Sequence, residues 1–240
     1  MTSGLSEEGP GYPSGAEIKI ANDSIKFALD EVPLVFTPGQ AGEWEYSNDG
    51  PNVLSGIISN VTGNSAEEFA REYLFEPLQI PEDEYLFLND NQNVSFGGYF
   101  FQCSPKVQAK LGILCLNNGS WEGEQIVDLN YLKDATTPQI YGNGYGYLWW
   151  MIDSPFEGYA AEGFGGQCIY VIPEFDIVVG FTAFDGGPYE QMISDYVLQF
   201  VEPDTPDDPM IPGFEINLTL LMVFCTTAVL IIRRKKYSKH

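Results

Sequence analysis

Histidine is almost absent from this chain of 240 residues, and the single one, His240, is the last residue. This position excludes a Ser-His-Asp or Cys-His triad, and a histidine-ligated zinc site, from the rest of the chain. The cysteines (Cys103, Cys115, Cys168 and Cys225) form no CxxC pair, so a thiolate metal site is disfavoured. We therefore expect no metal and no cofactor. Outside the apolar run that holds Cys225, we interpret the cysteines as small buried residues, with one internal disulfide as the alternative.

Basic residues are also scarce. The chain has 11 Lys and Arg against 34 Asp and Glu, and five of the cations lie in residues 233–240, so residues 1–232 carry a charge of −28. Such a surface repels phosphate backbones, which excludes a nucleic-acid partner. A hydrophobic content of 44% with 14% aromatics is too high for a disordered acidic chain. The composition predicts a folded acidic domain.

Residues 216–232 contain no charged side chain, and they are followed directly by Arg233-Arg234-Lys235-Lys236. This pattern predicts a transmembrane helix over 214–232, with a buried core helix as the alternative. The stretch 201–213 is rich in proline and acids and is typical of an extended linker. By the positive-inside rule the basic tail, 233–240, is expected in the cytoplasm and the body, 1–200, outside it, as a single-pass membrane protein.

Within the body, helical signals come first and strand signals follow. Apolar periodicity and capping residues predict helices over 23–31, 52–61, 65–74 and 107–116. Residues 166–172 and 176–184 are β-branched and aromatic runs separated by a turn, which indicates an antiparallel hairpin, with 158–164 as a preceding strand. A last amphipathic helix, 189–200, is expected to cover the sheet. This order predicts an α+β fold: a helical region, an antiparallel β meander and a covering C-terminal helix.

Several short segments resemble one family in their order and spacing. They are Thr2-Ser3-Gly4-Leu5, Phe36-Thr37-Pro38-Gly39, Tyr46-Ser47-Asn48, Val61-Thr62-Gly63, Asn117-Asn118-Gly119-Ser120-Trp121, Tyr145-Gly146-Tyr147-Leu148-Trp149 and Gly163-Phe164-Gly165-Gly166. The family is that of the serine β-lactamase-related hydrolases: class C β-lactamases, D-alanyl-D-alanine carboxypeptidases and esterase relatives. The resemblance covers residues 2 to about 200 and implies a β-lactamase/transpeptidase-like fold.

The resemblance implies acyl transfer to a serine of a Ser-x-x-Lys motif on a small-molecule or peptide substrate, an amide, β-lactam or ester. Tyr46 and Asn48 match the second motif, in which the tyrosine moves a proton and the asparagine holds the substrate amide. Ser47 lies between them. Phe164, Gly165 and Gly166 match the third motif, which lines the substrate.

The chain departs from the family pattern in two respects. No serine is followed three residues later by lysine, so the nucleophile motif is missing, and Phe164 stands where related proteins have histidine. Residues 1–20 also hold no export signal, although an external body needs one. We therefore expect the sequence to be the C-terminal part of the family's domain, in which the hairpin at 166–184 exposes an unpaired edge or an apolar face.

Three functions remain open at this point. The first is the C-terminal part of a membrane-anchored serine hydrolase, inactive as written. The second is a stand-alone external binding domain without catalysis. The third is a half-enzyme whose N-terminal region is supplied by a second chain.

Overall fold

The computed structural model describes residues 1–6, 18, 21–140, 142–183, 186–201, 220–224 and 227–233. The chain divides into two compact units. The first comprises Met1–Ser104 with Ile140–Asn143, and the second Pro105–Gln139 with Gly144–His240. Each unit is described by itself below.

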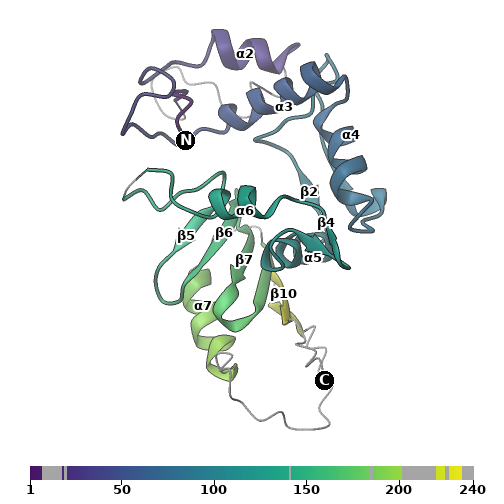
Figure 1. Cartoon of the computed structure of the whole chain (residues 1–240), viewed down its shortest axis with the longest axis vertical. Helices are drawn as coiled ribbons and strands as arrows, with labels where there is room; N and C mark the ends of the chain where they lie inside the picture. Colours follow the sequence, from purple (N-terminus) through teal and green to yellow (C-terminus); the bar gives the residue numbers. More distant parts are fainter. Residues whose placement is uncertain are drawn as a thin grey trace. The chain divides into compact units, whose positions relative to one another are not determined.

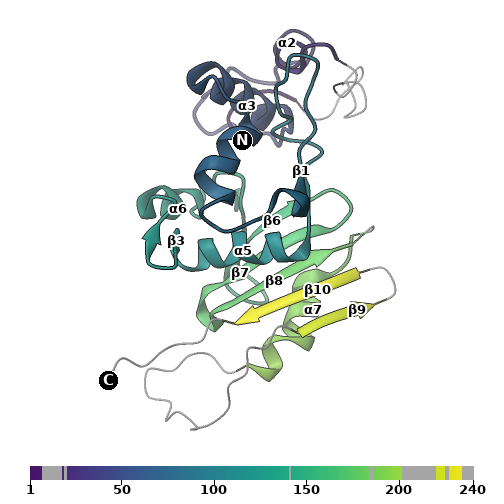
Figure 2. The same ribbon diagram turned by 90° about the vertical axis from the view of Figure 1, so that its right-hand side faces the viewer.

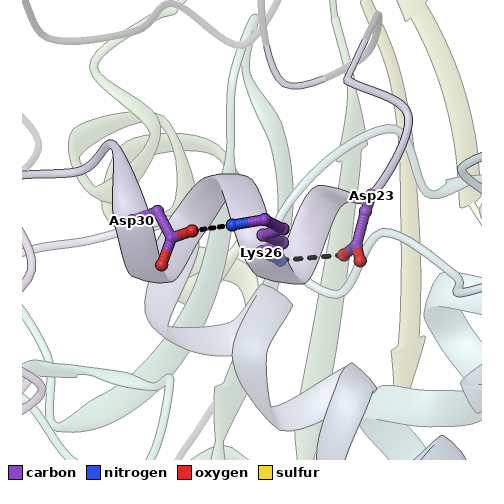
Figure 3. A network of polar contacts seen from close by, with 3 residues as sticks. All are labelled: Asp23, Lys26 and Asp30. Carbon is purple, nitrogen blue, oxygen red and sulfur yellow. Dashed lines mark hydrogen bonds and ion pairs between the residues drawn. The ribbon is translucent and has the colours of Figure 1, made fainter.

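The first unit opens with the short helix α2, Ser24–Asp30. Asp23 caps it, because its carboxylate accepts a hydrogen bond from the Lys26 backbone N–H at 2.8 Å. One turn further along the same face, the Lys26 ammonium pairs with the Asp30 carboxylate (Figure 3). The helix expected over 23–31 is thus confirmed, with Asp23 as its cap.

The long helix α3, Asp49–Thr62, confirms the predicted helix but has the opposite face buried. The apolar side chains expected to face inward include Leu54, Ile57 and Val61, which are 53%, 52% and 75% exposed. The buried face carries Asn52 and Ser55 instead. Hydropathy gave the wrong face here because the buried face of this helix carries polar side chains with hydrogen-bond partners distant in sequence.

After α3 the chain forms α4, Ala66–Ala70, and a π-helical turn, Arg71–Phe75. The capping box predicted at Ser65 is confirmed: Ser65 Oγ accepts from the Glu68 N–H at 3.2 Å, and the Glu68 carboxylate accepts from the Ser65 N–H at 2.7 Å. A 3₁₀ turn, Glu82–Glu84, and the paired strands β1, Tyr85–Leu86, and β2, Gln102–Cys103, complete the first unit.

The second unit contains a six-stranded sheet with the order β5-β6-β7-β8-β10-β9. Its strands are β5 Trp150–Ile152, β6 Gly158–Gly163, β7 Gln167–Ile172, β8 Ile177–Thr182, β9 Leu220–Phe224 and β10 Thr227–Arg233. All neighbouring strands are antiparallel. The meander expected over 158–184 is therefore confirmed.

Helices cover both faces of this sheet (Figures 1 and 2). Helix α5, Pro105–Leu116, lies along one face, and α7, Tyr189–Tyr196, lies against the other. Side chains alternate between the faces as a pleated strand requires: Val171 and Val178 pack towards α5, whereas Tyr170 and Val179 pack with α7. This arrangement confirms the α+β class and the covering helix.

Smaller elements complete the second unit. They are the strand pair β3 Ser120–Trp121 and β4 Glu124–Gln125, helix α6 Leu129–Ala135, and the 3₁₀ turns Pro173–Phe175 and Leu198–Phe200. In α7, Ile193 is buried as expected, but Tyr196 is 64% exposed and is not part of the core.

The transmembrane helix expected over 214–232 is a wrong prediction. Residues 220–224 and 227–233 are strands, and no helix among the described residues is long and apolar enough to span a bilayer. Strand β10 pairs with β8 from Ala228–Thr182 to Arg233–Ile177, at the edge that would otherwise be open (Figure 2). A short apolar run satisfies a buried strand as well as a helix, and periodicity does not separate the two.

Two other predicted segments fall largely outside the description. Of the linker expected over 201–213 only Val201 is described, and of the basic tail expected over 233–240 only Arg233, the last residue of β10.

The pairing of β10 with β8 and β9 gives a direct test. Leu230→Pro removes a backbone donor from a strand that is paired on both sides, so we expect a loss of at least about 2 kcal/mol in the free energy of unfolding, measured by urea denaturation. Leu230→Ala keeps the N–H and serves as the control. Equal losses in the two variants would contradict the strand assignment.

Candidate active site

Tyr46, Ser47 and Asn48 lie directly before α3, and Asn48 is the residue at its N-cap. The Tyr46 hydroxyl donates a hydrogen bond to Asn48 Oδ1 at 3.4 Å. Ser47 is fully buried, and its Oγ accepts from the Gly50 N–H at 3.3 Å inside the first turn of the helix. The tyrosine and asparagine of the predicted second motif are therefore brought together. A substrate contact from Ser47 stays a prediction.

The N-terminal segment that matched the family packs beside this motif. Its backbone oxygens accept hydrogen bonds from residues 35–45, and Leu5 forms a bridge with Leu34. The bonds run from Glu45 N to Met1 O at 3.0 Å, from Gly39 N to Thr2 O at 2.8 Å, and from Val35 N to Gly4 O at 2.8 Å. Three of the segments quoted from the sequence are thus neighbours in space.

Gly97 and Gly98 form the other wall of this region, and sequence reasoning missed them. A Cβ placed on Gly98 would lie 1.9 Å from the backbone oxygen of Asn48, and one on Gly97 would lie 2.3 Å from that of Pro51. Only glycine allows so close an approach of two backbones. The signal was available as a Gly-Gly pair enclosed by aromatics (Phe96-Gly97-Gly98-Tyr99-Phe100-Phe101).

A buried polar network fixes α3 against this glycine segment. Asn52 is fully buried, and its Oδ1 accepts from the Gly97 N–H at 3.2 Å while its Nδ2 donates to Ser24 O at 3.5 Å. Ser55 Oγ donates to the backbone oxygen of Ser95 at 2.5 Å. These hydrogen bonds fix the inner face of α3 against the segment 95–97 and against α2.

Asp90 joins α2 to the same network. Its Oδ2 accepts from both the N–H and the hydroxyl of Ser24 at 2.8 Å, and its Oδ1 accepts from the N–H groups of Gln92 and Val94 at 2.9 Å. A buried carboxylate with four hydrogen bonds holds the loop that leads to Gly97 in one conformation. Asp90 is a structural residue of the site.

The predicted third motif lies in the second unit, at the turn between β6 and β7. Phe164 is completely exposed at the tip, Gly165 and Gly166 have φ angles of 80° and 84°, and the Gly166 N–H donates to Gly163 O at 3.2 Å. Phe164 therefore offers a bare aromatic ring and no hydrogen-bond donor side chain. Tyr46, Ser47 and Asn48 belong to the first unit, whereas Phe164, Gly165 and Gly166 belong to the second.

The thiols in the described parts of the chain are not activated. Cys103, Cys115 and Cys168 are free cysteines, and burial raises the pKa of the first to about 11 and of the other two to about 12. They are neutral at physiological pH, whereas a nucleophilic cysteine needs a lowered pKa.

Next to Cys168, the buried Tyr170 hydroxyl contacts two carboxylates, Glu162 at 2.6 Å and Glu190 at 3.1 Å. Burial first, and then the hydrogen bond to Glu162, raise the pKa of Tyr170 well above its usual range. This tyrosine joins β6 and β7 to α7 and stays protonated.

Within the described ranges, His, Cys, Asp and Glu form no group of three or more that could hold a metal ion.

The approach of Gly98 to Asn48 predicts a large effect of one methyl group. Gly98→Ala must displace either the glycine segment or the start of α3, so we expect a loss of about 1–3 kcal/mol in the free energy of unfolding by urea denaturation. Gly186→Ala is the control, because its Cβ would meet nothing within 4 Å. A Gly98→Ala protein as stable as the control would contradict the described contact.

The raised thiol pKa values predict slow alkylation. In native protein at pH 8, iodoacetamide should modify Cys103, Cys115 and Cys168 far more slowly than in urea, where each thiol returns to a pKa near 8.5. Peptide mass spectrometry reads each cysteine separately. Rapid native modification of Cys168 would show that this thiol is accessible and ionised.

Comparisons with known proteins show what this chain is similar to. The family model described as β-lactamase matches residues 1–86, which include Tyr46 and Asn48. A curated relative, the 6-aminohexanoate-dimer hydrolase of Paenarthrobacter ureafaciens, is 23% identical over 154 residues, covering 59% of this chain and 39% of the relative. The chain therefore spans well under half the length of that protein.

Solved structures share the fold. A candidate 6-aminohexanoate-dimer hydrolase from Bacillus anthracis has a TM-score of 0.57 at 22% identity, covering 71% of this chain and 50% of that one. A candidate β-lactamase from Bacteroides dorei has a TM-score of 0.55 at 16% identity, covering 72% and 58%. A penicillin-binding protein homologue from Caulobacter crescentus has a TM-score of 0.50 at 16% identity, covering 71% and 59%. The match of the β-lactamase family model over the segment that carries the Tyr-Ser-Asn motif, together with these structures, supports a relationship to the serine β-lactamase-related family.

Proposed function

We propose that this chain supplies the Tyr-x-Asn part of a serine hydrolase that cleaves an amide, β-lactam or ester through an acyl-serine. The observation that carries the proposal is the hydrogen bond from the Tyr46 hydroxyl to Asn48 Oδ1 at the start of α3. The 154 residues aligned with a hydrolase and the match to the β-lactamase family model support it.

In the proposed reaction a serine oxygen attacks the substrate carbonyl and forms the new C–O bond. The serine proton passes to the Tyr46 oxygen and from there to the leaving nitrogen or oxygen, whose bond to the carbonyl carbon breaks. Water then repeats the two steps and releases the acid. Asn48 carries both a carbonyl oxygen and an amide donor, so it can hold the phenol in place and bind the substrate amide.

The sequence contains no Ser-x-x-Lys motif, since no serine among the 240 residues is followed three positions later by lysine. We propose that the serine and lysine come from polypeptide outside these 240 residues, either the same chain or a second one. A fluorophosphonate probe, applied to the protein isolated from its natural source, should label a serine in a Ser-x-x-Lys peptide that lies outside this sequence. Labelling of a serine within residues 1–240 would overturn this part of the proposal.

Tyr46→Phe tests the proton-transfer role. We expect the Tyr46→Phe variant, expressed in the natural source, to hydrolyse p-nitrophenyl acetate about 10²-fold more slowly than the unchanged protein, because the phenol oxygen is lost. Tyr73→Phe is the matched control, as Tyr73 is 55% exposed and contacts Phe69. An unchanged rate in Tyr46→Phe would refute the assigned role.

A binding domain without catalysis is the second candidate, and Phe164 favours it. A fully exposed phenylalanine replaces the histidine of the related third motif, so this position offers apolar contact and no charge or donor. Probe labelling that yields no modified serine in the natural-source protein, together with measurable ligand binding, would favour this second function over the first.

A further inference from the structure

Two aromatic residues, Tyr99 and Phe100, come directly after the backbone contact between Gly98 and Asn48. Tyr99 and Phe100 follow Gly98 directly, and the Gly98 Cα lies against the Asn48 backbone oxygen. Consecutive Cα atoms are about 3.8 Å apart, so both residues begin within about 8 Å of this contact. Both are partly exposed.

The backbone of Phe100 is held in a conformation that phenylalanine rarely adopts. Its φ angle is 61°, in the left-handed region where a bulky side chain is strained. The buried Phe96 ring holds it there through an edge-to-face contact, with ring centroids 5.3 Å apart. Glycine or asparagine would adopt this backbone conformation without strain. The phenylalanine at position 100 therefore carries a conformational strain energy that a smaller residue would not. Strain of this kind is concentrated at ligand-binding sites.

The charges around this position disfavour an anionic ligand. Glu43, Glu45 and Asp49 flank the Tyr-Ser-Asn motif in the sequence. In the described part of the first unit the side-chain cations are Lys26 and Arg71, and each pairs with an acid, Asp30 and Glu82 respectively. Among the described residues of this unit, a substrate carboxylate would therefore meet side-chain cations that are already paired and acids that flank the motif.

We propose that Tyr99 and Phe100 form the specificity-determining wall of the site and bind an uncharged apolar group beside the bond to be cleaved. Gly97 and Gly98 allow this wall to approach Asn48. The substrate class is a neutral amide or ester with an aromatic or aliphatic acyl group, rather than a carboxylate-bearing peptide or β-lactam. This assignment rests on the proposed function for the bond to be cleaved, but the binding step can be measured without catalysis.

Ligand-observed NMR titration tests the wall with two probes of the same shape, phenylacetamide and phenylacetate. We expect the full chain to bind phenylacetamide, and to bind phenylacetate at least about 10-fold more weakly because of the flanking acids. Phe100→Gly removes the ring and relieves the strained φ, so it should fold normally and yet lose about 10-fold in affinity for phenylacetamide. Phe100→Leu, which keeps an apolar side chain, should lose less.

Tyr73→Ala is the matched control, because it removes an exposed ring from the same unit and should leave the affinity unchanged. The proposal is overturned if wild-type chain does not bind phenylacetamide, if Phe100→Gly binds as tightly as wild type, or if phenylacetate binds equally well. Binding that follows these expectations, without labelling of any serine by the fluorophosphonate probe, would overturn the hydrolase function and leave the apolar wall in place.

Discussion

The two hydrogen bonds of the buried Asn52 side chain are the constraint on which the first unit depends. One joins α3 to the glycine segment and the other joins it to α2. A helix with an apolar inner face can slide or rotate slightly at little cost, whereas an amide with both ends bonded has one register only. The position of Tyr46 and Asn48 at the start of α3 therefore follows from polar contacts made along the first turn and a half of the helix.

The second unit is organised on a different principle. Strand β8 is buried on both faces, between α5 and α7, and its backbone groups are satisfied by β7 on one side and β10 on the other. A strand so deeply buried needs partners along both edges, because an unpaired backbone donor in this environment is costly. Strand β10, Thr227–Arg233, provides the partner along the second edge of β8.

The sequence predicted those elements whose signals are local. The capping box at Ser65 and the hairpin of β7 and β8 depend on neighbouring residues, and both were found where expected. The failures depend on partners distant in sequence. The inner face of α3 is chosen by Ser24 and Gly97, and the strand character of 227–233 by β8. The close approach of Gly98 could not be predicted from the sequence, because the residue it contacts, Asn48, lies fifty residues earlier.

The reversed burial of α3 has a consequence for how this sequence can change over time. Leu54, Ile57 and Val61 face solvent, so polar replacements there remove no core contact, while the small polar residues Asn52 and Ser55 cannot become larger or apolar without orphaning buried partners. Across related sequences the helix should therefore vary at its hydrophobic positions and stay fixed at its hydrophilic ones. A prediction based on hydropathy alone would assign the variable, solvent-exposed face of α3 to the core.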